Sequence, residues 1–165
     1  MRGRGMEIPP GRSYLFTDDA VYSAYAVLRH LMVKGRRGLV LTKSNPDSIP
    51  STYSVDCPII WIISKPPPGT KAITVDPLRL GKIYSLVADF VKNNPGSAIL
   101  LDGVELLIRD NDFTSVMKAL QMMNESISIS GSMLLVPVDA ERMAKQEFSF
   151  LEREIPPLII NIDLL

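Results

Sequence analysis

The sequence has few of the residues that build metal centres, disulfides and nucleophilic triads. Its 165 residues include one cysteine, Cys57, and one histidine, His30. A single cysteine cannot form an internal disulfide, and these two residues cannot supply the four ligands of a structural zinc site. One histidine and the lack of a Gly-x-Ser-x-Gly motif argue against nucleophilic hydrolysis. We therefore expect no zinc site and no cofactor, and no metal ligand among the cysteine and histidine residues.

An excess of one charge and a long apolar run are also missing. The 18 basic residues balance 18 acidic ones, whereas nucleic-acid binding normally leaves a basic excess. No apolar run approaches the roughly 20 residues that span a bilayer. Arg2 and Arg4 are not followed by the apolar segment of a signal peptide. We expect a cytoplasmic protein that binds neither nucleic acid nor membrane.

What remains is the composition of one globular domain. Hydrophobic residues make up 46% of the chain and charged residues 22%, which are ordinary values for such a domain. Residues 1–10 are rich in arginine, glycine and proline, and we expect them to form a flexible N-terminal arm. We expect residues 11–165 to form a single α/β domain.

Apolar segments alternate with amphipathic segments along almost the whole chain. This alternation predicts a mostly parallel sheet of about six strands between two layers of helices, a three-layer α/β/α sandwich. The predicted strands are residues 13–16, 38–42, 58–63, 97–102, 133–138 and 158–163, with a short extended piece at 73–75. The predicted helices begin after residue 19, at 76, 104 and 113, and after 139. Thr17 or Asp18 is expected to cap the first of these helices, and Asp76 the second.

Residues 97–105 are the segment around which the rest is organised. Four apolar residues lead without interruption into Asp102 and Gly103, which is typical of a strand buried on both faces. Asp102 would then emerge at the carboxyl edge of the sheet, where ligands of open α/β sheets bind. Glu105 follows three residues later. The two carboxylates could hold Mg²⁺ through water, or Asp102 could only cap the following helix.

The turn after the first predicted strand has the wrong chemistry for a phosphate. Dinucleotide and phosphate loops need glycines for close backbone approach, and a P-loop also needs a lysine. Here Thr17, Asp18 and Asp19 stand in that position. Two carboxylates at the mouth of a helix repel phosphate and occupy the end of the helix that attracts anions.

At this point the sequence resembles a known family. Residues 100–108, with Asn111 and Phe113 after them, are similar to an archaeal family known as number 835 in the domain-of-unknown-function series. Residues 11–15, the Ile60-Trp61 pair and residues 151–154 fit the same pattern, so that the resemblance covers residues 11 to 163. Members of this family occur attached to sensor and signalling modules, which implies a regulatory or scaffolding role. The signature residues are Trp61, Asp102, Gly103, Glu105, Asn111, Phe113 and Glu152.

More distantly, the order of elements resembles the KaiC-like and RecA-like branch of P-loop ATPases. In that branch a later apolar strand ends in the aspartate associated with magnesium, and Asp102 matches it. The resemblance implies the sheet order 3-2-4-5-1-6 for the six predicted strands. It also implies a vestigial magnesium or nucleotide edge formed by Asp102, Glu105, Asp18, Lys43 and Ser44.

The departures from that branch are larger than the matches. The phosphate loop is missing, Lys43 and Ser44 stand where a catalytic glutamate commonly follows the second strand, and the sensor position after residue 136 is not recognisable. Positioning and charge stabilisation supply most of phosphoryl-transfer catalysis, so we expect a degenerate ATPase fold without ATPase activity and without catalytic residues.

Three functions remain open at this stage. The first is a non-catalytic interaction or regulatory module, which binds an unknown protein partner and forms a homo-oligomer, as RecA-like relatives do. The second is a nucleotide or small-ligand sensor that binds near Asp102 without hydrolysis. The third is a cryptic enzyme that uses Asp102 or Glu105 as a general base.

Overall fold

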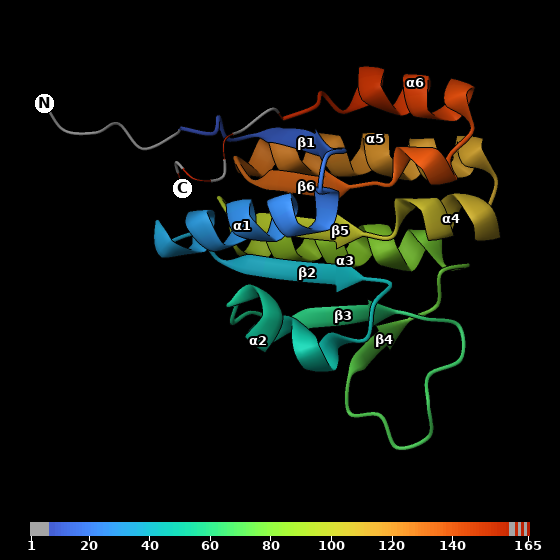
Figure 1. Cartoon of the computed structure of the whole chain (residues 1–165), viewed down its shortest axis with the longest axis horizontal. Coiled ribbons are helices and arrows are strands. Elements are labelled where there is room, and N and C mark those ends of the chain that lie inside the picture. Colours follow the sequence, from blue (N-terminus) through green and yellow to red (C-terminus); the bar gives the residue numbers. More distant parts are fainter. Residues whose placement is uncertain (1–6, 159–160, 162, 164) are drawn as a thin grey trace, which may run out of the picture.

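The structure is a computed structural model that describes residues 7–158, 161, 163 and 165. Helices and strands alternate as the sequence predicts (Figure 1). The strands are β1 (Arg12–Phe16), β2 (Gly38–Thr42), β3 (Ile59–Ile62), β4 (Ile73–Val75), β5 (Ala98–Asp102) and β6 (Met133–Pro137). The helices are α1 (Ala20–Val33), α2 (Ile49–Tyr53), α3 (Leu80–Asn93), α4 (Val104–Asp110), α5 (Phe113–Ser130) and α6 (Lys145–Glu154), with short 3₁₀ turns η1 (Pro46–Ser48) and η2 (Ala140–Arg142).

The six strands of the described chain form one parallel sheet in the order β1-β6-β5-β2-β3-β4. The predicted order of the first five predicted strands is confirmed. The sixth strand of the sheet, however, is β4, which the sequence indicated only as a short extended piece, and it lies at the edge beyond β3. The strand predicted at residues 158–163 lies largely outside the described residues. Its first described residues continue beside β1, where Leu158 N donates to Leu15 O at 2.9 Å.

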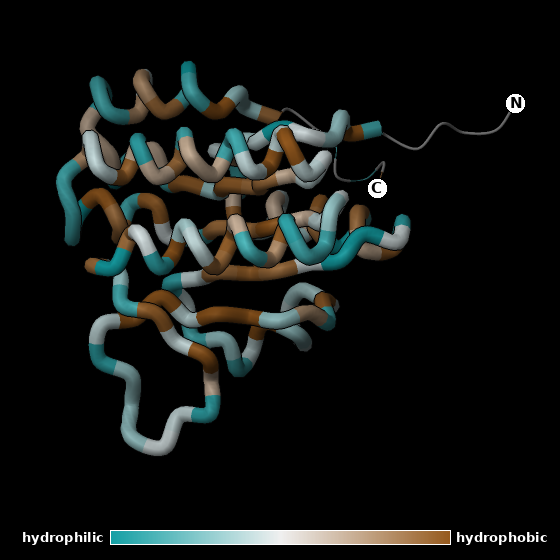
Figure 2. Tube along the Cα trace, turned by 180° about the vertical axis from the view of Figure 1, so that it is seen from behind, coloured by the Kyte–Doolittle hydropathy of each residue, from teal (hydrophilic) through white to brown (hydrophobic). Residues whose placement is uncertain are grey.

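The sheet is buried on both faces, which explains the continuous apolar runs of its strands. Successive residues of β5 alternate between two cores: Ile99 and Leu101 pack toward α3 and α5, while Ala98 and Leu100 pack toward α1. Figure 1 shows α1 on one face of the sheet and α3 and α5 on the other. Viewed from behind, the strands are mostly hydrophobic and the outer turns of the helices are largely hydrophilic (Figure 2). The three-layer α/β/α sandwich is therefore confirmed.

Several helix boundaries differ from the sequence-based prediction. Neither Thr17 nor Asp18 caps α1, because Asp19 is the N-cap residue and makes no side-chain cap. Asp76 does not begin α3; it closes a turn by accepting the Leu78 N–H, and the helix starts four residues later. The segment after Asp139 is the 3₁₀ turn η2, followed by α6. The short helix α2 was not predicted, since its sequence Ile-Pro-Ser-Thr-Tyr has no helical apolar period.

The predicted N-terminal arm overlaps the described chain only at residues 7–10. Within this piece Ile8 is buried in the core under α1, and the Pro9 carbonyl accepts a hydrogen bond from the Tyr14 hydroxyl at 2.6 Å. These four residues are therefore attached to the domain. No helix in the described part of the chain is long and apolar enough to cross a membrane.

Candidate functional site

Asp102 ends β5, the strand that lies between β2 and β6. Only 2% of the residue is exposed, because both neighbouring strands and the helices over them cover it. Its Oδ2 accepts a hydrogen bond from Thr42 Oγ1 on β2 at 3.2 Å, and its backbone carbonyl accepts the Lys43 N–H at 2.9 Å. The adjacent register Thr42–Asp102 thus joins two strand ends at one point.

Gly103 turns the chain from β5 into α4 with φ = +151°, a conformation that side chains with a Cβ rarely adopt. Because Gly103 is the N-cap residue of α4 and no side-chain cap is present, Asp102 does not cap this helix. The capping alternative for Asp102 is therefore wrong. The turn instead presents Glu105, in the first turn of α4, to the same edge of the sheet.

Glu105 forms an ion pair with Lys43, which follows β2. The distance from Lys43 Nζ to Glu105 Oε2 is 3.2 Å, and the same oxygen accepts the Asp139 N–H at 3.4 Å. The Glu105 side chain is 9% exposed and the Lys43 side chain 31%. This contact links the ends of β2, β5 and β6.

A cavity of about 490 Å³ opens at this edge. Volumes of this order accommodate small molecules. Its walls come from the turn between β1 and α1, from the first turn of α1, and from residues that end or follow β2, β5 and β6. They are Thr17, Asp19, Ala20, Val21, Lys43, Asp102, Glu105, Pro137, Val138, Asp139 and Arg142.

Burial is the main cause of the pKa shifts of Asp102 and of Tyr25 near it. Burial raises the pKa of the Asp102 carboxyl, the Lys43 ammonium opposes this shift, and the Glu105 charge reinforces it. Burial also raises the pKa of Tyr25, and the charge of Asp102 adds to that effect. Tyr25 lies on α1, under the sheet edge, and stacks on Tyr53 at 4.0 Å between ring centroids.

Two buried side-chain atoms in the described chain have no hydrogen-bond partner, and both lie close to Asp102. They are Glu105 Oε1 and the Tyr25 hydroxyl. Thr42 is near that hydroxyl, but the two groups do not meet ordinary hydrogen-bond geometry. Nearly all buried polar groups in proteins find a partner. The clustering of two exceptions marks this edge as the chemically unusual part of the molecule.

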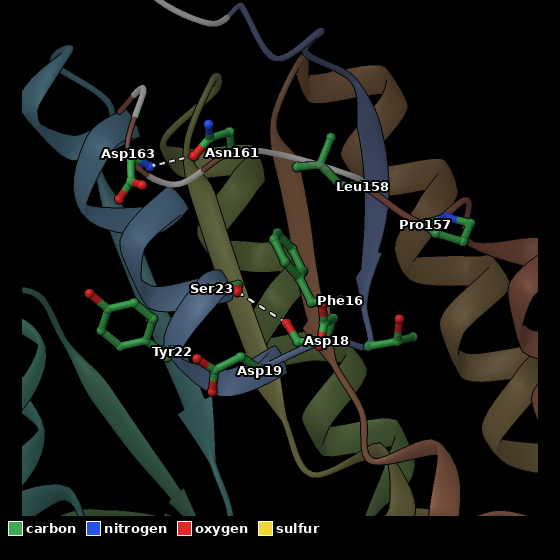
Figure 3. A pocket seen from close by; sticks show the side chains of 10 residues that line it. Phe16, Asp18, Asp19, Tyr22, Ser23, Pro157, Leu158, Asn161 and Asp163 are labelled. Carbon is green, nitrogen blue, oxygen red and sulfur yellow. Dashed lines mark hydrogen bonds between the residues drawn. The ribbon is translucent and has the colours of Figure 1, made fainter.

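The structure brings together three of the five residues predicted for this edge, Asp102, Glu105 and Lys43. Ser44 is exposed and approaches only through its N–H, which donates to Thr42 Oγ1 at 3.0 Å. Asp18 lies elsewhere: it lines a neighbouring cavity of about 850 Å³ between α1 and the chain near Leu158 (Figure 3). Its carbonyl accepts a hydrogen bond from Ser23 Oγ at 3.2 Å. Asp18 therefore does not line the cavity beside Asp102, although Thr17 and Asp19 on either side of it do.

Sequence reasoning missed several residues of the site. Thr42, the donor to Asp102, is the last residue of an apolar strand and was read only as part of it. Asp139 and Arg142 follow β6, and their ion pair of 3.4 Å lies at the cavity wall. The sequence does carry one signal: a polar residue ends or closely follows three apolar strands, at Thr42, Asp102 and Asp139.

The signature residues outside this edge have structural contacts. The Trp61 indole N–H donates to the Lys43 carbonyl at 3.3 Å and so supports the site from β3. Asn111 Nδ2 donates to the carbonyls of Pro77 and Leu107, closing the end of α4. Phe113 packs edge-to-face on Phe150 of α6, and Glu152 is half-buried on that helix.

The carboxylates, the lysine and the arginine of this arrangement can bond to a small polar group. No cluster of three or more histidine, cysteine or acidic residues with metal-binding geometry occurs in the described ranges. Asp19 at the mouth of α1 adopts left-handed angles, φ = 47° and ψ = 49°, and lies at the cavity wall. Its carboxylate stands at the end of the helix where a phosphate would be attracted.

Comparison with known protein families gives a match. The sequence model of the family described as "protein of unknown function (DUF835)" matches residues 19–155, which include every residue that lines the cavity beside Asp102 except Thr17. No curated protein matches the chain.

Proposed function

The chain belongs to the DUF835 family, and we propose that it is a non-catalytic protein-interaction and regulatory module on a degenerate ATPase fold. In this proposal the fold is KaiC-like or RecA-like, the protein associates with itself, and it serves signalling in archaea. It does not hydrolyse ATP. The observation that carries the proposal is the turn between β1 and α1.

That turn offers no cradle for a phosphate. Asp18 and Asp19 are exposed where glycines and a lysine would be required. The nearest lysine at this edge, Lys43, already pairs with Glu105 at 3.2 Å. Nucleotide phosphates would therefore meet carboxylates at the helix mouth and an engaged cation beside it.

The arrangement of the sheet supports descent from an ATPase. The order β3-β2-β5-β6-β1 is the one implied by the resemblance to RecA-like proteins. Asp102 stands at the end of the middle strand of these five, which is where the magnesium-associated aspartate of that branch is expected. The scaffold is complete, while the phosphate loop is absent.

A surface for a second copy is available at the β4 edge. β4 pairs with β3 alone in the described chain, and Ile73 on it is 62% exposed. Leu78, just before α3, is also 62% exposed. We refer to Ile73 and Leu78 as the β4 corner. Burial of two such side chains from each copy would contribute several kcal/mol to a dimer, at about 1.5–3 kcal/mol per fully buried side chain.

Light scattering after size-exclusion chromatography tests the self-association. We expect an oligomer at micromolar concentration that the double variant Ile73→Lys, Leu78→Lys converts to a monomer. Ile129→Lys is the matched control, because Ile129 is 81% exposed on α5, away from the β4 corner. A chain that is monomeric at high micromolar concentration would contradict self-association.

A phosphate-release assay with Mg·ATP tests the absence of catalysis. We expect no turnover above buffer, and no difference between the unchanged chain and Asp102→Asn. Turnover that disappears in Asp102→Asn would instead support a cryptic enzyme with Asp102 as its base.

The cavity of about 490 Å³ beside Asp102 favours a second candidate, a nucleotide or small-ligand sensor without hydrolysis. A ligand at 100 times its dissociation constant stabilises a protein by about 2.7 kcal/mol. Thermal melting with Mg·ATP, Mg·GTP and the corresponding diphosphates would then show a clear rise. Unchanged melting temperatures with all of them would reject the nucleotide sensor.

A further inference from the structure

The cavity beside Asp102 contains buried acceptors that the protein itself does not satisfy. Thr42 is the one side-chain donor to the Asp102 carboxylate among the described residues, although Asp102 is only 2% exposed. Glu105 Oε1 has no partner, although nine-tenths of the Glu105 side chain is buried. A buried carboxylate is costly unless charged or donor groups surround it. Two carboxylates at one wall of the cavity are therefore short of hydrogen-bond donors.

The charges that line the cavity are unbalanced in the same direction. Four acidic residues reach it, Asp19, Asp102, Glu105 and Asp139, against two basic ones, Lys43 and Arg142. Both basic side chains already form ion pairs, Lys43 with Glu105 and Arg142 with Asp139. The cavity is therefore acidic and has no free cation of its own among its described lining residues.

We propose that this cavity binds a small organic cation with N–H donors, either a primary ammonium or a guanidinium. Its N–H groups would bond to Asp102 and Glu105, and its positive charge would balance the acidic lining. The inference goes beyond the proposed function, because a protein-interaction module does not require a small ligand.

The same observations disfavour the other common ligands of such an edge. A phosphate would bring negative charge to an acidic cavity, and its usual helix-terminus site is taken by Asp19. A divalent ion prefers six or more oxygen ligands, and in the part of the chain that the structure describes no three histidine, cysteine or acidic side chains are arranged so that they could hold a metal ion. The volume of about 490 Å³ is also larger than a single metal ion needs.

Trp61 provides a direct reporter for binding. It is the one tryptophan in the sequence, and its indole N–H donates to the Lys43 carbonyl at 3.3 Å. A cation that binds beside Lys43 and Glu105 changes the field at this indole. Intrinsic fluorescence therefore follows the site without a label.

The experiment titrates the full chain with agmatine, which carries a guanidinium and a primary ammonium. Choline is the matched probe, because it is cationic but has no N–H donor. We expect agmatine to shift the Trp61 emission saturably, and to raise the melting temperature by about 5 °C near 100 times its dissociation constant. Choline should change neither reading.

Substitutions of the two carboxylates test whether agmatine binds in this cavity. Asp102→Asn and Glu105→Gln should each weaken agmatine binding about tenfold or more, since hydrogen bonds to a charged group contribute about 1.5–3 kcal/mol. Asp89→Asn, on the exposed face of α3, is the control and should bind agmatine unchanged. Melting of each variant without ligand shows that it is folded. Glu105→Gln decides the question if Asp102→Asn does not fold.

Each result of this experiment either supports or overturns the proposal. Saturable binding that both site variants weaken supports the proposal. The capped peptide acetyl-Gly-Arg-Gly-amide then distinguishes the source of the cation: tighter binding than agmatine assigns it to a protein side chain, and weaker binding to a free amine. The proposal is overturned if agmatine gives no saturable shift, if choline binds equally well, or if both site variants keep the affinity of the unchanged chain. None of these results affects the oligomer test of the β4 corner.

Discussion

Two turns of this protein have a similar local sequence pattern, but the acidic residues are exposed in one and buried in the other. In each turn, an apolar strand is followed by acid and then by a helix. Asp18 and Asp19 stand between β1 and α1, whereas Asp102 and Gly103 lead from β5 into α4. Asp18 and Asp19 are exposed, whereas Asp102 is buried and bonded to the neighbouring strand. Asp19 reaches the wall of the cavity as an exposed side chain, whereas the acid at the second turn is buried within the site.

The position of each strand in the sheet explains the difference. β5 lies between β2 and β6, so that Thr42, Lys43 and Asp139 surround the residues that follow it. β1 pairs with β6 on one side, and on the other it meets, among the described residues, the short segment near Leu158. An acid at the end of a central strand is desolvated and needs partners, whereas an acid at the end of β1 remains hydrated.

The largest effect is expected from Gly103→Ala at the β5 turn. Gly103 has φ = +151°, and an added Cβ would lie 3.5 Å from Lys43 Cβ. The contact is tolerable but the backbone angle is not, so we expect the free energy of unfolding to fall by about 1–3 kcal/mol. Urea unfolding measures this decrease in the free energy of unfolding. Gly81→Ala, in α3 with open space and no positive φ, is the control and should not destabilise. An equal effect at both glycines would contradict the special role of the β5 turn.

A smaller, pH-dependent effect is expected from Asp102→Asn. Burial raises the folded-state pKa of Asp102 above its unfolded value, so protonation favours the folded state. This contribution to stability is fully present below the unfolded pKa and is lost as the pH rises through the folded pKa. Asparagine does not ionise and can still accept from Thr42 Oγ1. We therefore expect the variant to be more stable than the unchanged chain near neutral pH, with the difference vanishing in acid.

Thermal or urea unfolding across this pH range measures the difference. Asp18→Asn is the matched change at the β1 turn, where the acid is exposed, and it should alter the free energy of unfolding by less than about 0.5 kcal/mol. If Asp102→Asn were less stable than the unchanged chain near neutral pH, the charged carboxylate would be well compensated, and the contrast between the two turns would fail.

The smallest effect is expected at Asp19. Its left-handed angles cost residues with a Cβ roughly 1–2 kcal/mol, and aspartate less than most. Asp19→Gly removes this strain but adds freedom to the unfolded chain, so we expect a net change within about 0.5 kcal/mol. Asp19→Ala should be less stable than Asp19→Gly by about 1 kcal/mol. Equal stability of the two variants would show that the left-handed turn is not retained in solution.

Most of the fold could be predicted from the sequence because buried strands and helices require apolar residues at characteristic spacings. The run from Ile99 to Leu101 has no polar face, which is enough to assign a strand covered on both sides. In short elements this spacing of apolar residues is harder to recognise. β4 has three residues and α2 has five, too few to show a period, and both were missed or only half recognised.

The site was predicted in part for a related reason. Asp102 and Glu105 stand out locally because they interrupt and follow an apolar run. Thr42 and Arg142 have no such local signal, since their roles depend on strands and turns that are distant in sequence. The sequence could not tell that Asp18 lines a different cavity from Asp102, because it does not show which side of a turn a side chain takes.

The sequence by itself determined the alternation of strands and helices, the acid at the end of the central strand and the absence of a phosphate loop, because these depend on residues that are neighbours in the chain. Only the tertiary structure decided that Lys43 pairs with Glu105, that Thr42 is the donor to Asp102, and that Asp18 lies apart from them. These contacts join residues about 60 positions apart, such as Thr42 and Asp102. Their partners are chosen by strand order and register, which decide where each strand ends.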